Sequence, residues 1–124
     1  MTTYTEGYHN SEIILSEAPG TLSREVITVV SGTGILSAGT VIGKVTASGK
    51  WRTYDDGHVD GSQTLVGVLL EAIDATSGDI TCAALVRFAE VKKDLLQWDA
   101  ACDATAKTAA YAAMIATPSF IAAR

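Results

Sequence analysis

Basic residues, prolines, cysteines and histidines are scarce in this sequence. The 124 residues include two prolines, two cysteines and two histidines, and nine Lys or Arg against fourteen Asp or Glu. The net charge of −5, with the basic residues scattered, excludes binding through phosphates, which relies on clustered Lys and Arg. We therefore expect neither a nucleic acid nor a membrane among the direct partners.

Uninterrupted apolar runs are also missing. Residues 26–43 carry no charge over 18 positions, the nominal length of a membrane span, but contain four glycines and five Ser or Thr. Those interruptions suit sheet and turn, so a membrane span is rejected. The first twenty residues have neither the basic region nor the apolar segment of a signal peptide, and nothing in them predicts secretion.

The two cysteines match no metal-binding pattern. Cys82 and Cys102 lie twenty residues apart in apolar surroundings, with no CxxC spacing and no histidines nearby. A cysteine in such surroundings usually behaves as a small hydrophobic residue. The sequence therefore predicts buried structural thiols and a reducing compartment.

The first twenty residues predict an extended arm. They carry three glutamates, no Lys or Arg, and close on the chain-breaking sequence APG at 18–20. Inside the arm, EIIL at 12–15 has strand propensity, and an isolated strand rarely stays ordered without a partner. We therefore divide the chain into an arm over residues 1–20 and a single domain over residues 21–124.

Short β-strands dominate the predicted domain. The β-branched and aromatic runs are separated by glycines and polar turns, which is typical of hairpins. DDGHVDGSQ at 55–63 predicts a polar loop, and TSGD at 76–79 a turn. The strands are expected at 24–32, at 39–46, at 51–54, at 64–75 with an interruption at Gly67, and without a break at 79–91.

An alanine-rich segment predicts one helix near the C-terminus. Residues 99–116 contain nine alanines, with Asp99 as the N-cap and Pro118 as the stop. SFIAAR, at the end, returns to strand character. The expected fold is α+β and mostly β, with short strands and hairpins, one C-terminal Ala-rich helix and an extended N-terminal arm. One face of the helix would combine Ala104, Thr108, Tyr111 and Ile115.

The glycine-rich stretch SGTGILSAGTVIGK at 31–44 invites comparison with phosphate-binding loops. Gly34 and Gly39 have the P-loop separation, but Thr40 stands where that motif needs its lysine. A dinucleotide fingerprint fails too, because Ser37 replaces the third glycine. Both motifs also need a helix directly afterwards. The glycines are therefore interpreted as turns and bulges between strands.

No other cluster predicts catalysis or metal binding. DDGHVDG lacks the order and the terminal glutamate of a calcium loop. The two histidines, His9 in the arm and His58 in the polar loop, give no support for a nucleophilic triad. We expect no enzyme, catalytic residue, metal or cofactor. The large aromatic residues are interpreted as core or interface anchors, namely Trp51, Tyr54, Phe88 and Trp98.

The order of these segments resembles a known family. GILSAGTVIGKVTASGKW at 34–51 is a glycine-marked strand, a short SGK turn and an aromatic strand. A polar loop, an apolar strand and a turn follow at 55–79, and ALVRFAEVKKDLLQW at 84–98 leads to the Ala-rich helix. This succession, over about residues 20–124, is similar to that of lambda-type bacteriophage head decoration proteins.

The resemblance implies a trimer on the outer surface of the expanded capsid. It would bind the major capsid protein at local three-fold sites and stabilise the shell against internal DNA pressure. The arm would add a strand to a capsid sheet, and the protein would be made in the host bacterial cytoplasm and end in the virion. The arm residues expected to contact the capsid are Tyr4, Tyr8, Ile13, Ile14 and Leu15.

Two other classes stay open at this point. One is a different trimeric surface or adhesion module of the virion. The other is a small enzyme or carrier domain with a modified lysine at Lys50, although ASGKWRT lacks the Asp-Lys or Met-Lys-Met context of such carriers. A pocket with converging polar groups, or a mass increase on Lys50, would favour the second class.

Overall fold

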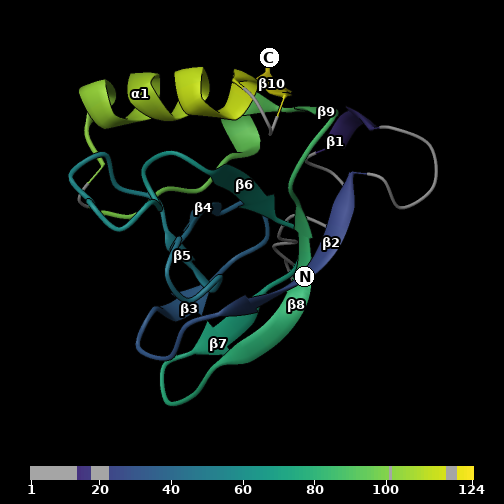
Figure 1. Cartoon of the computed structure of the whole chain (residues 1–124). Helices are drawn as coiled ribbons and strands as arrows, with labels where there is room; N and C mark the ends of the chain where they lie inside the picture. Colours follow the sequence, from purple (N-terminus) through teal and green to yellow (C-terminus); the bar gives the residue numbers. More distant parts are fainter. Residues whose placement is uncertain (1–13, 18–22, 101, 117–119) are drawn as a thin grey trace, which may run out of the picture.

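The computed structural model describes residues 14–17, 23–100, 102–116 and 120–124 (Figure 1). They form a mostly β fold with one α-helix, as the sequence predicts. The elements are β1 (Ile14–Glu17), β2 (Arg24–Val29), β3 (Gly34–Leu36), β4 (Val41–Lys44), β5 (Trp51–Thr53), β6 (Val66–Leu69), β7 (Ile73–Ala75), β8 (Ile80–Leu85), β9 (Ala89–Val91), a 3-10 turn (Lys93–Leu95), α1 (Ala104–Ile115) and β10 (Ile121–Ala123).

Five of the strands close into a barrel in the order β2-β5-β4-β6-β8. β2 and β5 are parallel, and the other neighbours are antiparallel. Gly67 leaves the room that the Trp51 ring occupies, because a Cβ at this position would lie 3.2 Å from the ring. Every strand contributes side chains to one cluster inside the barrel, which includes Ile27, Val29, Ile42, Trp51, Leu69, Cys82 and Ala84.

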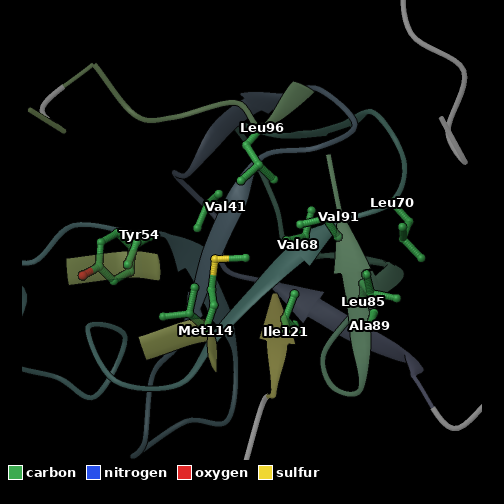
Figure 2. Close-up of a cluster of buried hydrophobic side chains, with 12 residues drawn as sticks. Val41, Tyr54, Val68, Leu70, Leu85, Ala89, Val91, Leu96, Met114 and Ile121 are labelled. Atoms are coloured by element: carbon green, nitrogen blue, oxygen red, sulfur yellow. The ribbon is translucent and has the colours of Figure 1, made fainter. Parts of the chain in front are cut away.

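A second cluster lies on the outside of the barrel, beneath α1 and the three-stranded sheet β1-β9-β10. Strand alternation places Val41 and Val68 on this outer face, opposite the barrel interior. Figure 2 shows Met114 of α1 and Ile121 of β10 side by side, with the Met114 side chain pointing toward Val41. The small sheet and α1 are therefore held to the barrel by one continuous apolar layer.

Figure 1 shows the two accessory layers at opposite ends of the molecule. α1 and the β1-β9-β10 sheet lie at the top, and the two-stranded β3-β7 sheet lies at the bottom. Leu36 of β3 and Ala75 of β7 join the cluster inside the barrel, so this pair covers its lower end. The β3-β7 pair thus closes the lower end of the barrel, and α1 with the β1-β9-β10 sheet covers part of its outer face.

Two predicted strands are each divided in the structure. The segment 64–75 forms β6 in the barrel and β7 in the pair with β3, and Gly67 does not interrupt β6. The segment 79–91 forms β8 in the barrel and β9 in the sheet with β1 and β10, separated near Phe88. The prediction of single strands is wrong because one apolar run can serve two different sheets, and composition does not mark the change.

The helix is shorter than predicted and begins at a different cap. The Oδ1 atom of Asp103 accepts a hydrogen bond from the Ala106 N–H at 2.8 Å, so Asp103 is the N-cap. Asp99 instead lies before a turn, where its carbonyl accepts from the Cys102 N–H. The prediction of Asp99 as the cap is wrong because either aspartate has the right side chain and tertiary packing decides between them.

The helix also buries a different face from the one outlined by the sequence. Ala106, Ala110 and Met114 are buried, at a spacing of four residues that keeps them on one stripe. Of the predicted set, Ala104, Thr108 and Ile115 are exposed and Tyr111 is partly buried. Alanines on the buried stripe allow α1 to approach β6 and β10 closely. Pro118, the predicted stop, lies outside the described residues.

Replacing the N-cap should destabilise the protein measurably. Asp103→Ala leaves the Ala106 N–H without its acceptor, and we expect the free energy of unfolding to fall by about 1 kcal/mol. Asp99→Ala is the matched control and should change it by less than about 0.5 kcal/mol. Urea unfolding at fixed protein concentration measures both variants. A larger loss for Asp99→Ala than for Asp103→Ala would contradict this cap assignment.

Candidate interaction surface

The glycine-rich stretch 31–44 makes turns between strands, as its interpretation requires. Gly32, Gly34 and Gly39 all have positive φ, between 89° and 96°, a region that favours glycine. β3 and β4 follow these turns, and neither is a helix that could hold an anion at its N-terminus. The stretch therefore has a structural role: it forms β4 of the barrel and β3, which pairs with β7.

The polar loop 55–63 uses its charged groups to fix its own shape. The Asp60 carboxylate accepts hydrogen bonds from the Ser62 hydroxyl at 2.6 Å and the Ser62 N–H at 3.0 Å. Arg52 of β5 donates to the other oxygen of Asp60 at 3.0 Å. These bonds, those from Ser62 above all, lower the pKa of Asp60 to about 2. The carboxylate therefore stays charged at neutral pH and anchors the loop to β5.

His58 belongs to the same network. Its Nε2 lies 2.7 Å from an Arg52 nitrogen, and its Nδ1 lies 2.9 Å from the Ser62 hydroxyl oxygen. Because a guanidinium can only donate, Nε2 must accept, which assigns the proton to Nδ1 and makes that nitrogen the donor to Ser62. Within the described part of the chain, no group of three or more His, Cys, Asp or Glu is arranged to hold a metal ion.

The thiols and Lys50 are also engaged in structural contacts. Cys82 is buried and Cys102 partly buried, and the Cys102 thiol donates to the Tyr54 carbonyl at 3.1 Å. Burial, followed by the nearby Asp55, raises the pKa of Cys102 to about 11, so it is not a thiolate at neutral pH. The Lys50 ammonium lies 2.6 Å from the Asp79 carboxylate, an ion pair that ties it to the turn before β8.

Two of the five arm residues expected at the capsid lie in β1. Ile14 pairs with Val91 of β9 and packs partly buried against the outer cluster. Leu15 lies at a register shift between Ile14 and Ser16, and 47% of it is exposed. Among the described residues, no strand pairs with the other edge of β1. The remaining three, Tyr4, Tyr8 and Ile13, lie outside the described residues.

A comparison with protein-family models decides the family. The model described as bacteriophage lambda head decoration protein D matches residues 3–117. The chain belongs to this head decoration family. No curated protein matches the chain at a significant level. The head decoration family comprises structural proteins of the phage capsid, which is not a class of enzymes.

Membership in the head decoration family directs attention from pockets to exposed apolar surface. A decoration protein acts by binding to the surface of another protein, and large exposed apolar side chains mark such contacts. The structure contains no helix, among the described residues, that is long and apolar enough to span a membrane. The exposed large apolar residues are Leu15, Val26, Ile35, Val59, Phe88, Ile115 and Phe120.

The four aromatic anchors expected from the sequence have different placements in this head decoration protein. Trp51 and Tyr54 are buried, and Trp98 is partly buried with its ring packed edge-on against Tyr111 at 5.6 Å. Phe88 is 43% exposed. Phe120, which sequence reasoning did not single out, stacks on Phe88. Only the apolar character of SFIAAR pointed to this segment, and nothing local predicts an exposed ring.

Proposed function

We propose that this chain decorates the outside of the expanded phage capsid as a homotrimer. It binds the major capsid protein at local three-fold sites and stabilises the shell against the pressure of the packaged DNA, which it does not contact. The observation that carries the proposal is the family match over residues 3–117, nearly the whole chain. On this proposal the protein is made in the host bacterial cytoplasm and ends on the outer surface of the virion.

The arm, residues 1–20, is proposed as the primary capsid contact. β1 has one edge paired with β9, and its other edge is free of described strands. A free edge presents a row of backbone N–H and C=O groups to which an extended segment of another protein can add. Leu15 offers an exposed apolar side chain there, and Tyr4, Tyr8, Ile13 and Ile14 complete the proposed contact set.

Trimer formation would make such a contact strong. A single added strand gains little after the cost of ordering the arm. Three arms on one trimer bind the shell together, so that the second and third contacts form at a high effective concentration. Linked contacts of this kind increase the overall affinity by roughly 10² to 10⁴ over one contact. A small domain can therefore clamp a shell without any large single interface.

Imaging of decorated heads tests this function. Purified protein is mixed with expanded, undecorated heads assembled from the capsid protein encoded with this chain, and with unexpanded heads as the control. We expect added density at the local three-fold sites of the expanded heads. Absence of density, or density at the tail or baseplate of whole virions instead, would contradict the proposal and favour another surface or adhesion module.

A further inference from the structure

Phe88 and Phe120 have an unusual backbone conformation. Their φ angles are 51° and 49°, and no other non-glycine residue in the described part of the chain has a positive φ. This left-handed region brings the Cβ of an L-residue close to its own carbonyl, so a bulky side chain there is strained. Strain of this kind persists where the surrounding structure enforces it, and it gathers at functional sites.

The surrounding structure does enforce both conformations. Each phenylalanine directly precedes a strand, and the parallel register of Ala89 with Ile121 makes the two neighbours. The Ser23 hydroxyl, on a fully buried residue, donates to the Phe88 carbonyl at 2.8 Å. The Phe120 N–H donates to the Ala116 carbonyl, at the end of α1, at 3.1 Å. Strand pairing and these two hydrogen bonds therefore hold the strained backbone in place.

The strained backbone holds the two rings as a stacked pair at the surface rather than in the core. The two rings stack with centroids 5.7 Å apart and planes only 4° from parallel. Each residue is 43% exposed, and neither belongs to one of the two buried clusters. Two residues that keep 43% of their surface exposed and lie outside both clusters contribute little to the core, so the stability of the fold alone does not explain why bulky residues occupy these positions.

The stack lies within the length of one short strand of the point where residues 1–13 lead into β1. Ala89, next to Phe88, pairs with Glu17, the last residue of β1, whereas Ile14, the first residue of β1, pairs with Val91 at the other end of β9. Thirteen residues precede β1, enough for several residues of added strand on a partner. Ala89 and Val91 are two residues apart, about 7 Å along β9, so a partner held by the arm beside Ile14 lies within reach of the two rings.

The charges around the stack are paired within the chain. Glu17 and Arg24 form a two-bonded ion pair, with the closest approach at 2.8 Å, and Arg124 pairs with Glu90 at 3.3 Å. A partner that covers the rings does not have to supply a compensating charge at these positions. An apolar surface is the complement that this patch fits best.

We propose that the Phe88–Phe120 stack is a second, apolar anchor that docks against an apolar patch of the capsid protein, next to the arm. This inference rests on the proposed decoration function and adds a contact that belongs to the folded domain. The competing occupant of the stack is a second copy of this chain, in which case the rings belong to the trimer interface. The two occupants give different results in the same experiment.

The test replaces both rings without adding strain. Phe88→Gly with Phe120→Gly removes the rings and suits a positive φ, so we expect a folded trimer with an unfolding midpoint close to that of the original protein. Binding to expanded, undecorated heads should weaken by about 10- to 100-fold, as for the loss of an interface anchor. Ile35→Ala and Val59→Ala remove exposed apolar side chains elsewhere and should leave binding unchanged.

A second variant guards against failure of the glycine pair to fold. Phe88→Asn with Phe120→Asn replaces the rings with polar side chains, and asparagine tolerates a positive φ. We expect the same weakening of head binding. Light scattering on every variant reports the oligomeric state. Unchanged head binding by a folded variant would overturn the proposed anchor. Conversion of the trimer to monomers would overturn it too, because the rings would then lie in the contact between copies of this chain. If the unsubstituted protein itself fails to bind heads, the decoration function fails as well.

Discussion

Deletion of residues 2–13 is expected to abolish binding to expanded, undecorated heads while the domain keeps its stability. This segment contains Tyr4, Tyr8 and Ile13 of the proposed contact set, and its loss from all three arms of a trimer removes both the affinity of each contact and their mutual reinforcement. The described domain begins at Ile14, which pairs with Val91 and packs against the outer cluster. Cosedimentation with heads measures binding, and thermal unfolding measures stability.

A longer deletion separates the two roles of the N-terminal region. Removing residues 2–18 also removes β1, with the packing of Ile14 and the ion pair between Glu17 and Arg24. We expect this variant to lose binding and, in addition, about 2 kcal/mol of unfolding free energy. Normal decoration by the variant lacking residues 2–18 would show that the arm is not the capsid contact. Equal destabilisation by both deletions would show that β1 contributes nothing to the fold.

Gly43→Ala is expected to have the largest effect on stability of any single substitution considered for this chain. Gly43 lies in the middle of β4, where a Cβ would overlap the carbonyl group of Ser62 in the polar loop. The obstructing atoms belong to the backbone, so no side-chain rotation relieves the overlap. Either β4 or the loop must move, and we expect a loss of about 3 kcal/mol or more.

The movement would also break contacts that join the loop to the barrel. The Thr46 N–H donates to the Asp60 carbonyl at 2.9 Å, and the Lys44 N–H donates to the Leu65 carbonyl at the same distance. For a domain of this size the expected loss corresponds to a fall of roughly 10 °C in Tm. Calorimetry at fixed protein concentration measures it.

The matched control for this substitution is Gly78→Ala. Gly78 has no positive φ, and a Cβ there would meet no atom within 4 Å. The unfolding free energy should change by less than about 0.5 kcal/mol. A Gly43→Ala protein with the Tm of the original would mean that the loop does not pack on β4 in solution.

The parts of the fold that the sequence predicts are those marked by local chemistry. The β-branched run before Gly32 is β2, the turn at Ser48 and Gly49 leads into β5, and the Asp- and Gly-rich segment 55–63 is a loop. The Ala-rich segment is a helix because alanine favours that state in nearly any context. Local residue type is sufficient to predict that each of these elements exists, whereas the start of the helix, at Asp103 and not Asp99, depends on tertiary packing.

The missed boundaries depend on partners distant in sequence. Leu70 and Val86 directly follow the barrel strands β6 and β8, where the chain crosses to another sheet, and both are apolar residues inside apolar runs. Which sheet a strand joins is determined by pairings such as β3 with β7 and β9 with β10, whose members lie more than 25 residues apart. No local pattern carries that information, so a continuous strand is the natural reading of either run.

The candidate surface was predictable only in part for the same reason. The composition of the first twenty residues is enough to predict an arm, and β1 lies within it. Phe88 stacks on Phe120 only because β9 and β10, whose first residues are 32 positions apart in the sequence, pair in parallel register. The positive φ of Phe88 is also supported by a contact with Ser23, 65 residues away, which no local pattern indicates.

The arrangement of β1, β9 and β10 brings the two ends of the described chain together. Ile14 and Ala123 both pair with Val91, on opposite sides of β9, so they lie about 10 Å apart, two strand spacings. A linker of three or four residues after Arg124 could therefore join them into a circularly permuted domain. A protein fused after Arg124 would in turn lie close to the start of β1, and such a fusion needs a long spacer.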